Sequence, residues 1–430
     1  YLSDDQPIDD DEDAATSDID SQRYRIHLDH NQSLDERTLL LMQLNYLSDT
    51  DVIEDFFNRE YRAVRQPENY ISLSHQREHF SVSALLNARL NDFYSNVDRL
   101  PEVTIDFMRQ QLGRSSFYYE GQTQAARLER VWMDSLSGED YASIRFDTEH
   151  MVYQPRRYFG WLNLVPRVGY RGTYYSDTKE TVTTESVSTT NTTTTTVVGG
   201  VTNTVTSAVT STNSVSTDVA RGAELRNLFE VGAEASFKTF KVWEDWGENR
   251  IDLRHILEPY ANYTLRMNSG VEPVDLYQFD SVDALGELHQ ILIGARNKLQ
   301  VKRNGRPHDL IDLDTYTRLK FNAEDDEQVL EKFYVDAEFR PNQWLSFDVD
   351  GIFSVEESSL EQINTRFNLS QKDEWLARVE HRYRADESNL IAGLLTLYPS
   401  QRWAYNAFAR YEFEQSRVQE VGGYVQRKLD

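Results

Sequence analysis

The sequence predicts an all-β fold, a large antiparallel transmembrane outer-membrane β-barrel of which this chain carries about 19 strands. Apolar and polar residues alternate with a period of two over many segments, which is the pattern of strands with two unlike faces. Aromatic residues make up 12% of the chain, yet its mean hydropathy is −0.64. A barrel reconciles these two values because only every second strand residue meets lipid. No stretch approaches the roughly 18 to 20 apolar residues of a membrane-spanning helix.

The period of two is clearest in the C-terminal part of the chain. Phe333 and Val335 share one face of a predicted strand, whereas Asp336 and Glu338 share the other. About seven strands of this kind are predicted between residues 327 and 430, each roughly 10 to 13 residues long. This length suits a tilted membrane span better than an ordinary globular strand.

Earlier strands are less regular but readable. Residues 23–29 and the apolar series from Leu40 to Tyr46 form the first predicted hairpin. The other predicted strands cover residues 68–77, 79–91, 101–111, 115–132, 143–153, 161–175, 222–238, 250–266, 288–303 and 308–322. A single sheet of so many strands must close or curl.

The charge balance excludes one class of partner. The net charge is −26, from 71 acidic and 45 basic residues, and a nucleic-acid partner would require a basic surface. Cations are the more natural small partners. Residues 1–21 contain the acidic run Asp9 to Asp13, which repels itself and is predicted to be a mobile loop.

Residues 177–218 form a low-complexity Thr/Ser/Val segment between two predicted strands. Its β-branched content permits a projecting β-hairpin that turns at Gly199-Gly200, and mobile coil is the alternative. Long connections alternate with short turns along the chain, as in barrels with long external loops. We therefore expect an extracellular loop insertion at 177–218 within a barrel domain that covers residues 22–430.

No catalytic or cofactor-binding signature is present in the sequence. There is no P-loop, dinucleotide fingerprint, zinc helix or nucleophile elbow. The absence of cysteine excludes disulfides, thiolate metal sites and cysteine nucleophiles. The nine histidines permit a catalytic cluster in principle, but chance proximity to the many carboxylates is expected. The sequence thus predicts no catalytic residue, no cofactor and no metal site, in a protein that is not an enzyme.

The polar faces of the last strands carry charges that could contact the phosphates and sugars of a passing amphiphile. These residues are Arg378, Glu380, Arg382, Arg384, Asp348 and Asp350. Solvated charges that pair with their neighbours are the alternative. Four aromatic residues near strand starts, Trp344, Trp375, Trp403 and Tyr405, fit an interfacial girdle.

One segment combines a cation, an imidazole and a carboxylate beside a proline. By strand parity, Arg254 and Glu258 share one face, whereas His255 and Pro259 share the other. Arg254 and Glu258 could form a lumenal charge pair. Alternatively, the segment is a strand end kinked by Pro259, which has no N–H to donate to the ladder.

Four short segments, in a fixed order, carry a family resemblance. They are Tyr46-Leu47-Ser48-Asp49 followed by Glu54-Asp55-Phe56, then Arg99-Leu100-Pro101-Glu102, then the stretch from Pro166 to Tyr175, and finally the stretch from Leu253 to Tyr263. The fourth, with its Arg-His-x-Leu-Glu-Pro core, is the most specific. Over residues 23 to about 270 their order and spacing resemble the C-terminal barrel domain of the LptD (OstA-like) family of lipopolysaccharide-assembly proteins, and the remainder matches as barrel strands.

The resemblance implies a barrel of about 26 strands that receives lipopolysaccharide through an N-terminal β-jellyroll and releases it between its first and last strands. It also implies a plug lipoprotein (LptE-like) and a periplasmic bridge protein (LptA-like). The sequence departs from the family pattern in lacking a jellyroll, the full number of strands and the cysteines that some members use. The predicted barrel is therefore incomplete, and we expect the strands of the lateral gate to lie outside this chain.

The function expected from this resemblance is insertion of lipopolysaccharide into the outer leaflet of the outer membrane. Two alternatives stay open. A general porin or uptake barrel would share the alternation of polar and apolar residues. A soluble all-β adhesin or binding protein would instead pack its apolar faces together.

Overall fold

The computed structural model describes residues 2–3, 22–57, 60–61, 64–133, 138–198, 201–246, 251–303, 305–321, 329–372, 374–400 and 402–428. The acidic run predicted to be a mobile loop lies outside these residues. The strand β1 (Leu2–Ser3) precedes this run and the strand β2 (Gln22–Arg23) follows it. The two strands pair as a short antiparallel sheet. Among the described residues, no helix is long and apolar enough to cross a membrane.

The fold class predicted from the sequence is confirmed, because 21 strands belong to one large sheet. Its strands are β3 (Arg25–Asp35), β4 (Thr38–Leu47), β5 (Tyr70–Gln76), β6 (Phe80–Asn87), β7 (Asn96–Gln111), β8 (Tyr118–Val131), β9 (Tyr141–Tyr153), β10 (Arg156–Tyr158), β11 (Leu162–Tyr175), β14 (Glu224–Ser236), β15 (Thr239–Trp246), β16 (Ile251–Gly270), β17 (Leu288–Arg303), β18 (Arg306–Lys320), β19 (Leu330–Asn342), β20 (Leu345–Ser354), β21 (Ser359–Gln371), β22 (Trp375–Arg384), β23 (Ser388–Ser400), β24 (Trp403–Glu412) and β25 (Arg417–Arg427). Strands adjacent in the chain pair antiparallel throughout residues 288–427.

Each of the strands predicted from the sequence has a counterpart in this sheet, and the structure adds β10 and β15. The pattern missed β10 because it has only three residues. It missed β15 because only residues 237–238 separate it from β14, so that no turn signal marks a new strand. β15 pairs with the first half of β16, from Thr239 opposite Leu257 to Trp246 opposite Ile251.

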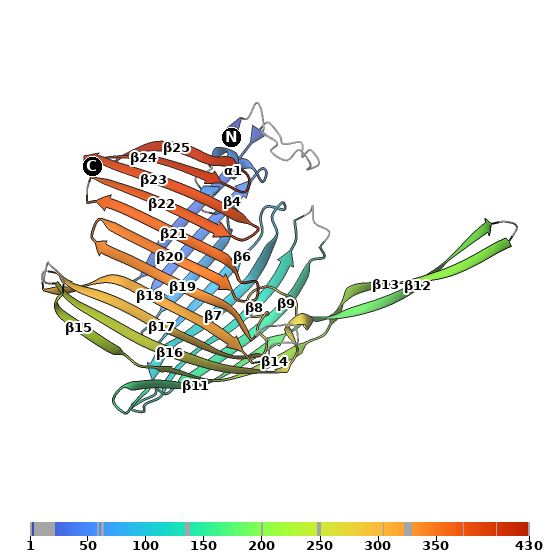
Figure 1. Cartoon of the computed structure of the whole chain (residues 1–430), viewed down its shortest axis with the longest axis horizontal. Coiled ribbons are helices and arrows are strands. Elements are labelled where there is room, and N and C mark those ends of the chain that lie inside the picture. The colour runs from blue at the N-terminus through green and yellow to red at the C-terminus, as the bar shows by residue number, and fades with distance from the viewer. Residues whose placement is uncertain are drawn as a thin grey trace. The chain divides into compact units, whose positions relative to one another are not determined.

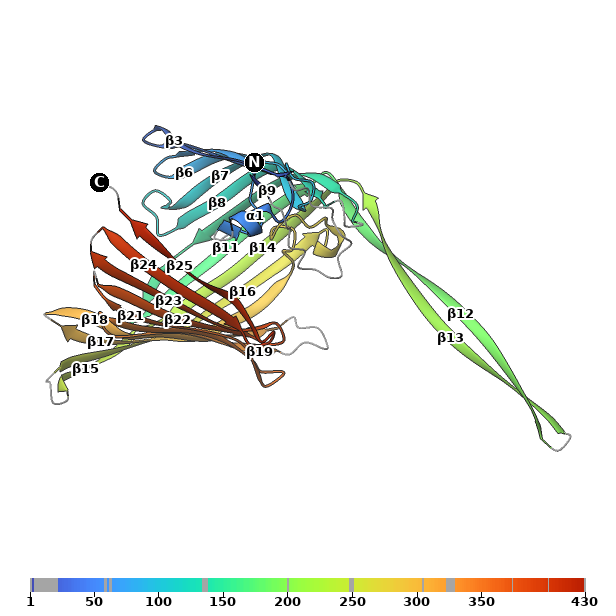
Figure 2. The same cartoon turned by 90° about the horizontal axis from the view of Figure 1, so that it is seen from above.

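The chain divides into two compact units. Unit 1 comprises Tyr1–Val152, Gly169–Phe229 and Met267–Glu287, and unit 2 comprises Tyr153–Val168, Glu230–Arg266 and Leu288–Asp430. In Figure 1, strands β17 to β24 of unit 2 run side by side and are coloured yellow to red. Figure 2 shows strands β6 to β8 of unit 1 side by side in blue and teal.

Unit 2 presents two unlike faces. On one face, Phe339, Phe347, Phe367 and Val379 lie opposite one another on four successive strands. Each of these side chains is 38–44% exposed, so this apolar row is not packed into a core. An apolar band on the outer surface of a β-sheet is the lipid-facing pattern of membrane barrels.

The row one register position away is charged. Glu338, Asp348, Arg366 and Glu380 lie opposite one another on the same four strands. Because successive side chains of a strand point to opposite faces, this row occupies the other face of the sheet. The predicted alternation of polar and apolar residues therefore becomes two separate surfaces.

Aromatic residues of the predicted girdle gather at one end of the strands of unit 2. Trp344 lies in the turn before β20, whereas Trp375 and Trp403 are the first residues of β22 and β24. Alternate strands of an antiparallel sheet begin at the same end. The three indoles therefore lie at that end, and their depth in a bilayer stays a prediction.

Unit 1 has longer connections than unit 2. The connection between β4 and β5 contains the helix α1 (Val52–Phe56), and the connection between β16 and β17 contains a 3-10 helix, η1 (Pro273–Asp275). Val52 and Ile53 of α1 are buried against Leu47. These connections fold back onto the strands of unit 1, which gives this unit small hydrophobic cores.

The Thr/Ser-rich segment forms a β-hairpin of β12 (Thr178–Val198) and β13 (Val201–Arg221). The strands pair residue for residue, from Thr178 opposite Arg221 to Val198 opposite Val201, which is the hairpin alternative of the sequence prediction. They form a two-stranded sheet of their own, seen in Figure 2 as a twisted ribbon. The extracellular placement of this segment stays a prediction.

Candidate functional site

The charged row of unit 2 is paired on β21 and β22. Arg366 Nε donates to Glu380 Oε1 at 2.9 Å, and Arg382 Nη2 donates to Glu380 Oε2 at 3.1 Å. Arg378 donates to Asn368 at 2.8 Å, and Arg384 lies 3.0 Å from Glu387. The sequence predicted this face correctly, and the structure favours neighbour pairing for these charges.

The same face is strongly acidic on β18, β19 and β20. Asp336 lies directly between Asp314 and Asp350 in the sheet register. Like charges that face each other across strands destabilise a sheet. This face therefore tolerates a local repulsion that water and neighbouring cations can reduce.

The segment predicted as a lumenal charge pair is built differently. Arg254 donates to Gln300 on the neighbouring strand β17, whereas Glu258 lies 3.1 Å from Lys238 and 4.0 Å from Arg296. The two residues share a face as predicted, but each takes its own partners. Their spacing of four residues along a strand carries their charged groups apart.

The alternative prediction, a strand end at Pro259, is wrong. Pro259 lies in the middle of β16 and pairs with Ala295 of β17. Its carbonyl oxygen accepts a hydrogen bond from Phe237 N at 3.3 Å. The nitrogen and the carbonyl of one strand residue point to the same side, so the missing N–H faces residues 237–238, where β14 ends and β15 has not yet begun. The proline is tolerated because the ladder is already interrupted there.

His255 makes one weak contact in this segment. Its Nε2 lies 3.4 Å from Asn297 Oδ1, a long and weak hydrogen bond.

Within the described residues there is no group of three or more His, Cys, Asp or Glu side chains that could hold a metal ion.

Arg167 belongs to the third segment of the family resemblance, Pro166 to Tyr175, and joins this segment to the fourth, Leu253 to Tyr263. Arg167 donates to Glu230 Oε1 at 3.0 Å, to Asn262 Oδ1 at 2.7 Å and to Thr264 Oγ1. Arg266 donates to the second oxygen of Glu230 at 3.1 Å. The resemblance thus reflects a polar network on the face opposite the exposed apolar residues.

Unit 1 contains a buried ionic site that the sequence did not reveal. Arg145 of β9 is fully buried, and its guanidinium donates to Asp280 Oδ1 and Asp283 Oδ1 at 2.8 Å each. A further bond runs from Arg145 to Asp280 Oδ2 at 2.7 Å, and another to Gln124 at 2.9 Å. Asp280 and Asp283 belong to residues 271–287, which we call the inner loop. Arg145 therefore holds the inner loop against the strands of unit 1.

Asp283 is the centre of this buried site. Its Oδ1 also accepts the hydroxyl of Tyr175 at 3.1 Å, and its Oδ2 accepts the backbone N–H of Phe279 at 2.8 Å and that of Asp280 at 3.1 Å. Burying a charge is favourable only when it is paired and its hydrogen-bonding capacity is filled. Asp283 meets both conditions.

Arg226 of β14 is the second fully buried arginine at the inner loop. It donates to the carbonyl oxygens of Val282, Asp283 and Leu285 at 2.8 to 3.1 Å, and its guanidinium lies 5.6 Å from the centre of the Tyr175 ring. One side chain thus binds three backbone carbonyls within a stretch of four residues. Arg226 therefore fixes the path of the loop backbone.

Apolar contacts complete the docking of the inner loop. Leu276 is fully buried, and Phe279 packs against Ala126 and Leu128 of β8. Tyr277 stacks on Tyr141 with 4.6 Å between the ring centres. The loop thus has a small hydrophobic core of its own beside the ionic site.

The ionisation of Asp280 depends on this docking. Burial opposes its negative charge, but the hydrogen bonds and the positive charge of Arg145 outweigh burial and hold the pKa of Asp280 below its usual value. Asp280 is therefore an anion at neutral pH. Acidification through this lowered pKa would remove the attraction to Arg145.

The first segment of the family resemblance forms a second ionic cluster in unit 1. Arg23 is fully buried and donates to Asp49 at 2.6 Å and to Asp55 at 2.5 Å. Burial opposes the charge of Asp49, yet the hydrogen bonds from Arg23 and Ser48 keep the pKa of Asp49 below its usual value. Arg23 thereby joins the start of the described strands to the connection that contains α1.

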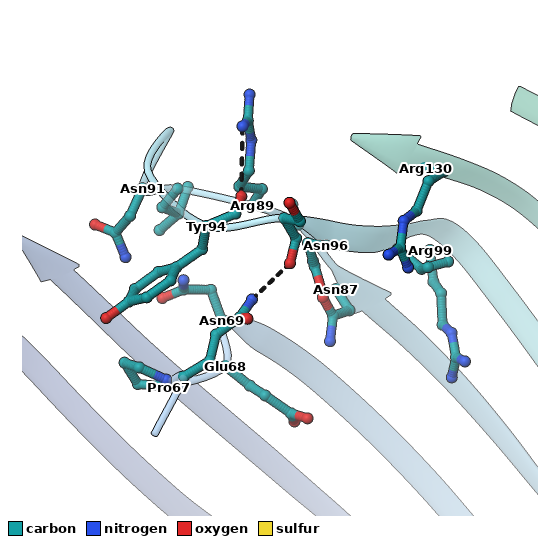
Figure 3. A pocket seen from close by; sticks show the side chains of 15 residues that line it. Pro67, Glu68, Asn69, Asn87, Arg89, Asn91, Tyr94, Asn96, Arg99 and Arg130 are labelled. Carbon is teal, nitrogen blue, oxygen red and sulfur yellow. Dashed lines mark hydrogen bonds between the residues drawn. The ribbon is translucent and has the colours of Figure 1, made fainter. Parts of the chain in front are cut away.

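A cavity of about 420 Å³ opens beside these clusters, at the end of β6 and the start of β7 (Figure 3). Its lining residues are Gln66, Pro67, Glu68, Asn69, Asn87, Ala88, Arg89, Leu90, Asn91, Tyr94, Ser95, Asn96, Val97, Arg99 and Arg130. All of them belong to unit 1. Arg99 comes from the second segment of the family resemblance and also lies 3.7 Å from Asp280 of the inner loop.

Sequence reasoning missed the buried ionic site and the cavity of unit 1. Arg145, Arg226, Asp280, Asp283 and Arg130 have no distinctive spacing along the chain. One signal was available, because Leu276 and Phe279 are large apolar residues in a segment without strand periodicity. Apolar residues in a long connection indicate that it packs against something.

The fold and its two faces define a class of protein. A large antiparallel sheet with an exposed apolar face, a charged opposite face and long connections is typical of β-barrel proteins of bacterial outer membranes.

Comparison with protein families shows to which family of that class the chain belongs. The family model LptD, described as LPS transport system D, matches residues 21–406. The chain therefore belongs to the LptD family, whose members act in lipopolysaccharide transport and outer-membrane assembly, as the sequence resemblance predicted. A comparison with individual curated proteins gives no match.

Proposed function

We propose that this protein is the outer-membrane translocon component that inserts lipopolysaccharide into the outer leaflet. The observation that carries the proposal is the separation of the sheet into an exposed apolar face and a charged face, in a chain of the LptD family. An amphiphile with a charged glycan and apolar tails needs both kinds of surface.

The proposed mechanism involves no covalent step. The lipid A tails stay in contact with the hydrophobic phase, whereas the glycan moves along the charged face, so that neither part is desolvated in an unfavourable environment. Arg366 and Arg382 pair with Glu380 but are 48% and 59% exposed, so the N–H groups that Glu380 leaves free would donate to sugars and phosphates on this path. The protein is accordingly proposed to be a transporter and not an enzyme.

The proposal includes location and partners. The protein would be integral to the outer membrane, with the hairpin of residues 177–218 on the extracellular side of a barrel domain covering residues 22–430. A plug lipoprotein (LptE-like) and a periplasmic bridge protein (LptA-like) would act with it. For Arg254, His255, Glu258 and Pro259 we propose a structural role, because their contacts are to neighbouring strands of the same sheet.

The direct test is depletion of the full-length protein in its native cell, followed by quantification of lipopolysaccharide at the cell surface. Loss of surface lipopolysaccharide, with accumulation at the inner membrane or in the periplasm, is the expected result. Unchanged delivery would refute the proposal.

The two alternatives predict other outcomes. A porin or uptake barrel would let small solutes diffuse freely through the full-length protein in liposomes, and lipopolysaccharide export would continue without it. An adhesin or soluble binding protein would partition into the aqueous fraction without detergent. The exposed row of Phe339, Phe347 and Phe367 argues against the soluble alternative, since these rings would otherwise contact water.

A further inference from the structure

The cavity of unit 1 is lined mainly by arginines and amides. Three of its lining residues are arginines, Arg89, Arg99 and Arg130, and one, Glu68, is acidic. The lining is therefore net positive in a chain whose net charge is −26. Its volume of about 420 Å³ falls within the range of about 300 to 1,000 Å³ that is common for small-molecule sites.

We infer that this cavity binds a phosphorylated sugar. The inference deepens the proposed function and rests on it for its biological meaning, because it names the part of the transported glycolipid that the cavity would hold. The binding chemistry itself is argued from the lining residues alone.

Arg130 is the principal anion ligand in this inference. Its Nε is buried and has no hydrogen-bond partner, although an unsatisfied buried donor costs about 1 to 3 kcal/mol. The guanidinium lies 4.3 Å from the centre of the Trp132 ring, which holds it flat. A planar guanidinium presents paired N–H groups that match the oxygens of a phosphate.

Arg99 adds a second positive charge to the same part of the cavity. Its side chain is 30% exposed and lies 3.5 Å from Glu102. Figure 3 shows Arg99 and Arg130 toward one end of the cavity. A phosphate at this end would meet both guanidinium groups, and its negative charge would also ease the burial of Arg130.

The remaining polar lining suits sugar hydroxyls. Asn69, Asn87, Asn91 and Asn96 contribute amides, which both donate and accept hydrogen bonds as hydroxyls do. Some of these atoms are already used, since Asn91 bonds to the backbone of Leu47 and Asn45. The Nδ2 group of Asn96 bonds to Asn87 and to Asp98 at 3.0 and 2.8 Å. These bonds fix the amides in place before a ligand arrives.

Hydrogen bonds to backbone carbonyls hold two of the residues that line the cavity, Arg89 and Tyr94, in place. Arg89 donates to the carbonyl oxygens of Asp92 and Trp132 at 2.9 and 2.8 Å, so this arginine shapes the loop instead of binding an anion. Tyr94 donates its hydroxyl to the carbonyl of Thr50 at 3.4 Å, and burial with the nearby charge of Asp51 raises its pKa to about 12. Tyr94 therefore stays neutral and offers a ring face to a sugar at any ordinary pH. A preformed site loses less entropy on binding.

The test is calorimetric titration of the detergent-solubilised full-length protein with glucose 6-phosphate, inorganic phosphate and glucose in parallel. Glucose 6-phosphate should bind more tightly than either fragment by at least tenfold. Arg130→Gln and Arg99→Gln should each weaken its binding about tenfold or more, which is the effect of losing one charge-assisted contact.

Arg127→Gln is the matched control. Arg127 lies on the same strand as Arg130 and is 58% exposed, but it does not line the cavity. This variant should bind glucose 6-phosphate within about twofold of the parent protein. Arg130→Lys keeps the charge without the paired N–H groups and should give an intermediate loss.

Three outcomes would overturn the inference. Equal affinity for inorganic phosphate and glucose 6-phosphate would reduce the cavity to a simple anion site. Equal affinity for glucose would remove the role of the phosphate, and unchanged binding by Arg130→Gln would place the ligand elsewhere. The variants should keep the parent's resistance to heat unfolding in detergent, which separates lost binding from lost folding.

This measurement is independent of transport. Binding in the cavity with normal surface lipopolysaccharide after depletion would refute the proposed function and leave the binding site standing. Normal dependence of surface lipopolysaccharide on the protein, without sugar-phosphate binding, would refute only the cavity assignment.

Discussion

Unit 1 buries three arginines beneath its long connections, whereas unit 2 displays the arginines of its charged face to solvent. In unit 1, Arg23, Arg145 and Arg226 are fully buried, and each is bound by carboxylates or carbonyls of a long connection. In unit 2, Arg366 and Arg382 are 48% and 59% exposed and pair with Glu380 of the adjacent strand or their own.

The difference follows from the connections. The inner loop and the connection that contains α1 cover polar residues of unit 1, while the turns of unit 2 at residues 355–358, 385–387 and 413–416 are too short to cover anything. The same alternation of polar and apolar residues therefore gives ion pairs that contribute very differently to stability in the two units. Removing one partner of a buried pair costs about 3 to 5 kcal/mol, whereas an exposed pair contributes about 0 to 1 kcal/mol.

Arg145→Met should have the largest effect, because it leaves Asp283 charged, buried and without its ionic partner. We expect a loss of about 3 to 5 kcal/mol in the stability of unit 1, measured by urea unfolding in detergent, and faster proteolysis of the inner loop. Arg366→Met in unit 2 should cost about 0 to 1 kcal/mol.

The double variant Arg145→Met with Asp283→Asn should recover part of the loss, since residue 283 is then no longer a buried carboxylate without its arginine. Similar losses for Arg145→Met and Arg366→Met would contradict this difference between the two units.

Leu276→Ala should have the next largest effect. This side chain is fully buried in the inner loop, and truncation of a buried leucine costs about 2 to 5 kcal/mol through lost transfer energy and the cavity left behind. Val274→Ala is the control in the same loop, because Val274 is 65% exposed and should change stability by no more than about 0.5 kcal/mol. Equal effects of the two variants would show that the loop is not docked.

Acidification should release the inner loop without a mutation. The pKa of Asp280 is lowered in the folded protein, so its contribution to stability is complete above the unfolded value of about 3.9 and is lost as pH falls through the folded value. Hydrogen exchange of the inner loop, corrected for intrinsic rates, should be constant from about pH 8 to pH 5 and rise below about pH 4.

In the Asp280→Asn variant, the backbone amides of the inner loop should exchange faster at neutral pH. Their exchange should also lose most of its dependence on pH below about pH 5. A loop that becomes more protected below pH 4 would contradict the assignment.

The smallest expected effect is a gain in unit 2. Asp336→Asn removes a charge between Asp314 and Asp350 and should stabilise the protein by about 0.2 to 1 kcal/mol at low ionic strength. Salt should reduce the gain, because these groups are open to solvent. Asp309→Asn is the control of opposite sign, since Asp309 lies 3.1 Å from Lys298. A loss on Asp336→Asn would indicate a bound cation on this face.

Much of unit 2 could be predicted because its structure follows the period of two. Phe333, Phe339, Asp336 and Glu338 face the two sides that parity assigns to them, and their strand has the predicted antiparallel neighbours. Pro259 was misjudged for a physical reason. Its effect on the strand depends on whether the adjacent ladder is intact at that point, and this is a property of residues 237–238, far away in the sequence.

By itself, the sequence determined the all-β class, the strands with two faces and the membership of the LptD family. These features arise from the local alternation of polar and apolar residues and from short motifs. Both can be read from the sequence without knowing which segments pack together. Only the tertiary structure decided that the inner loop docks on Arg145 and Arg226 and that Arg99 and Arg130 meet in a cavity. Such contacts join residues more than 50 positions apart or side chains of separate strands, and no periodicity records which distant group a buried arginine will find.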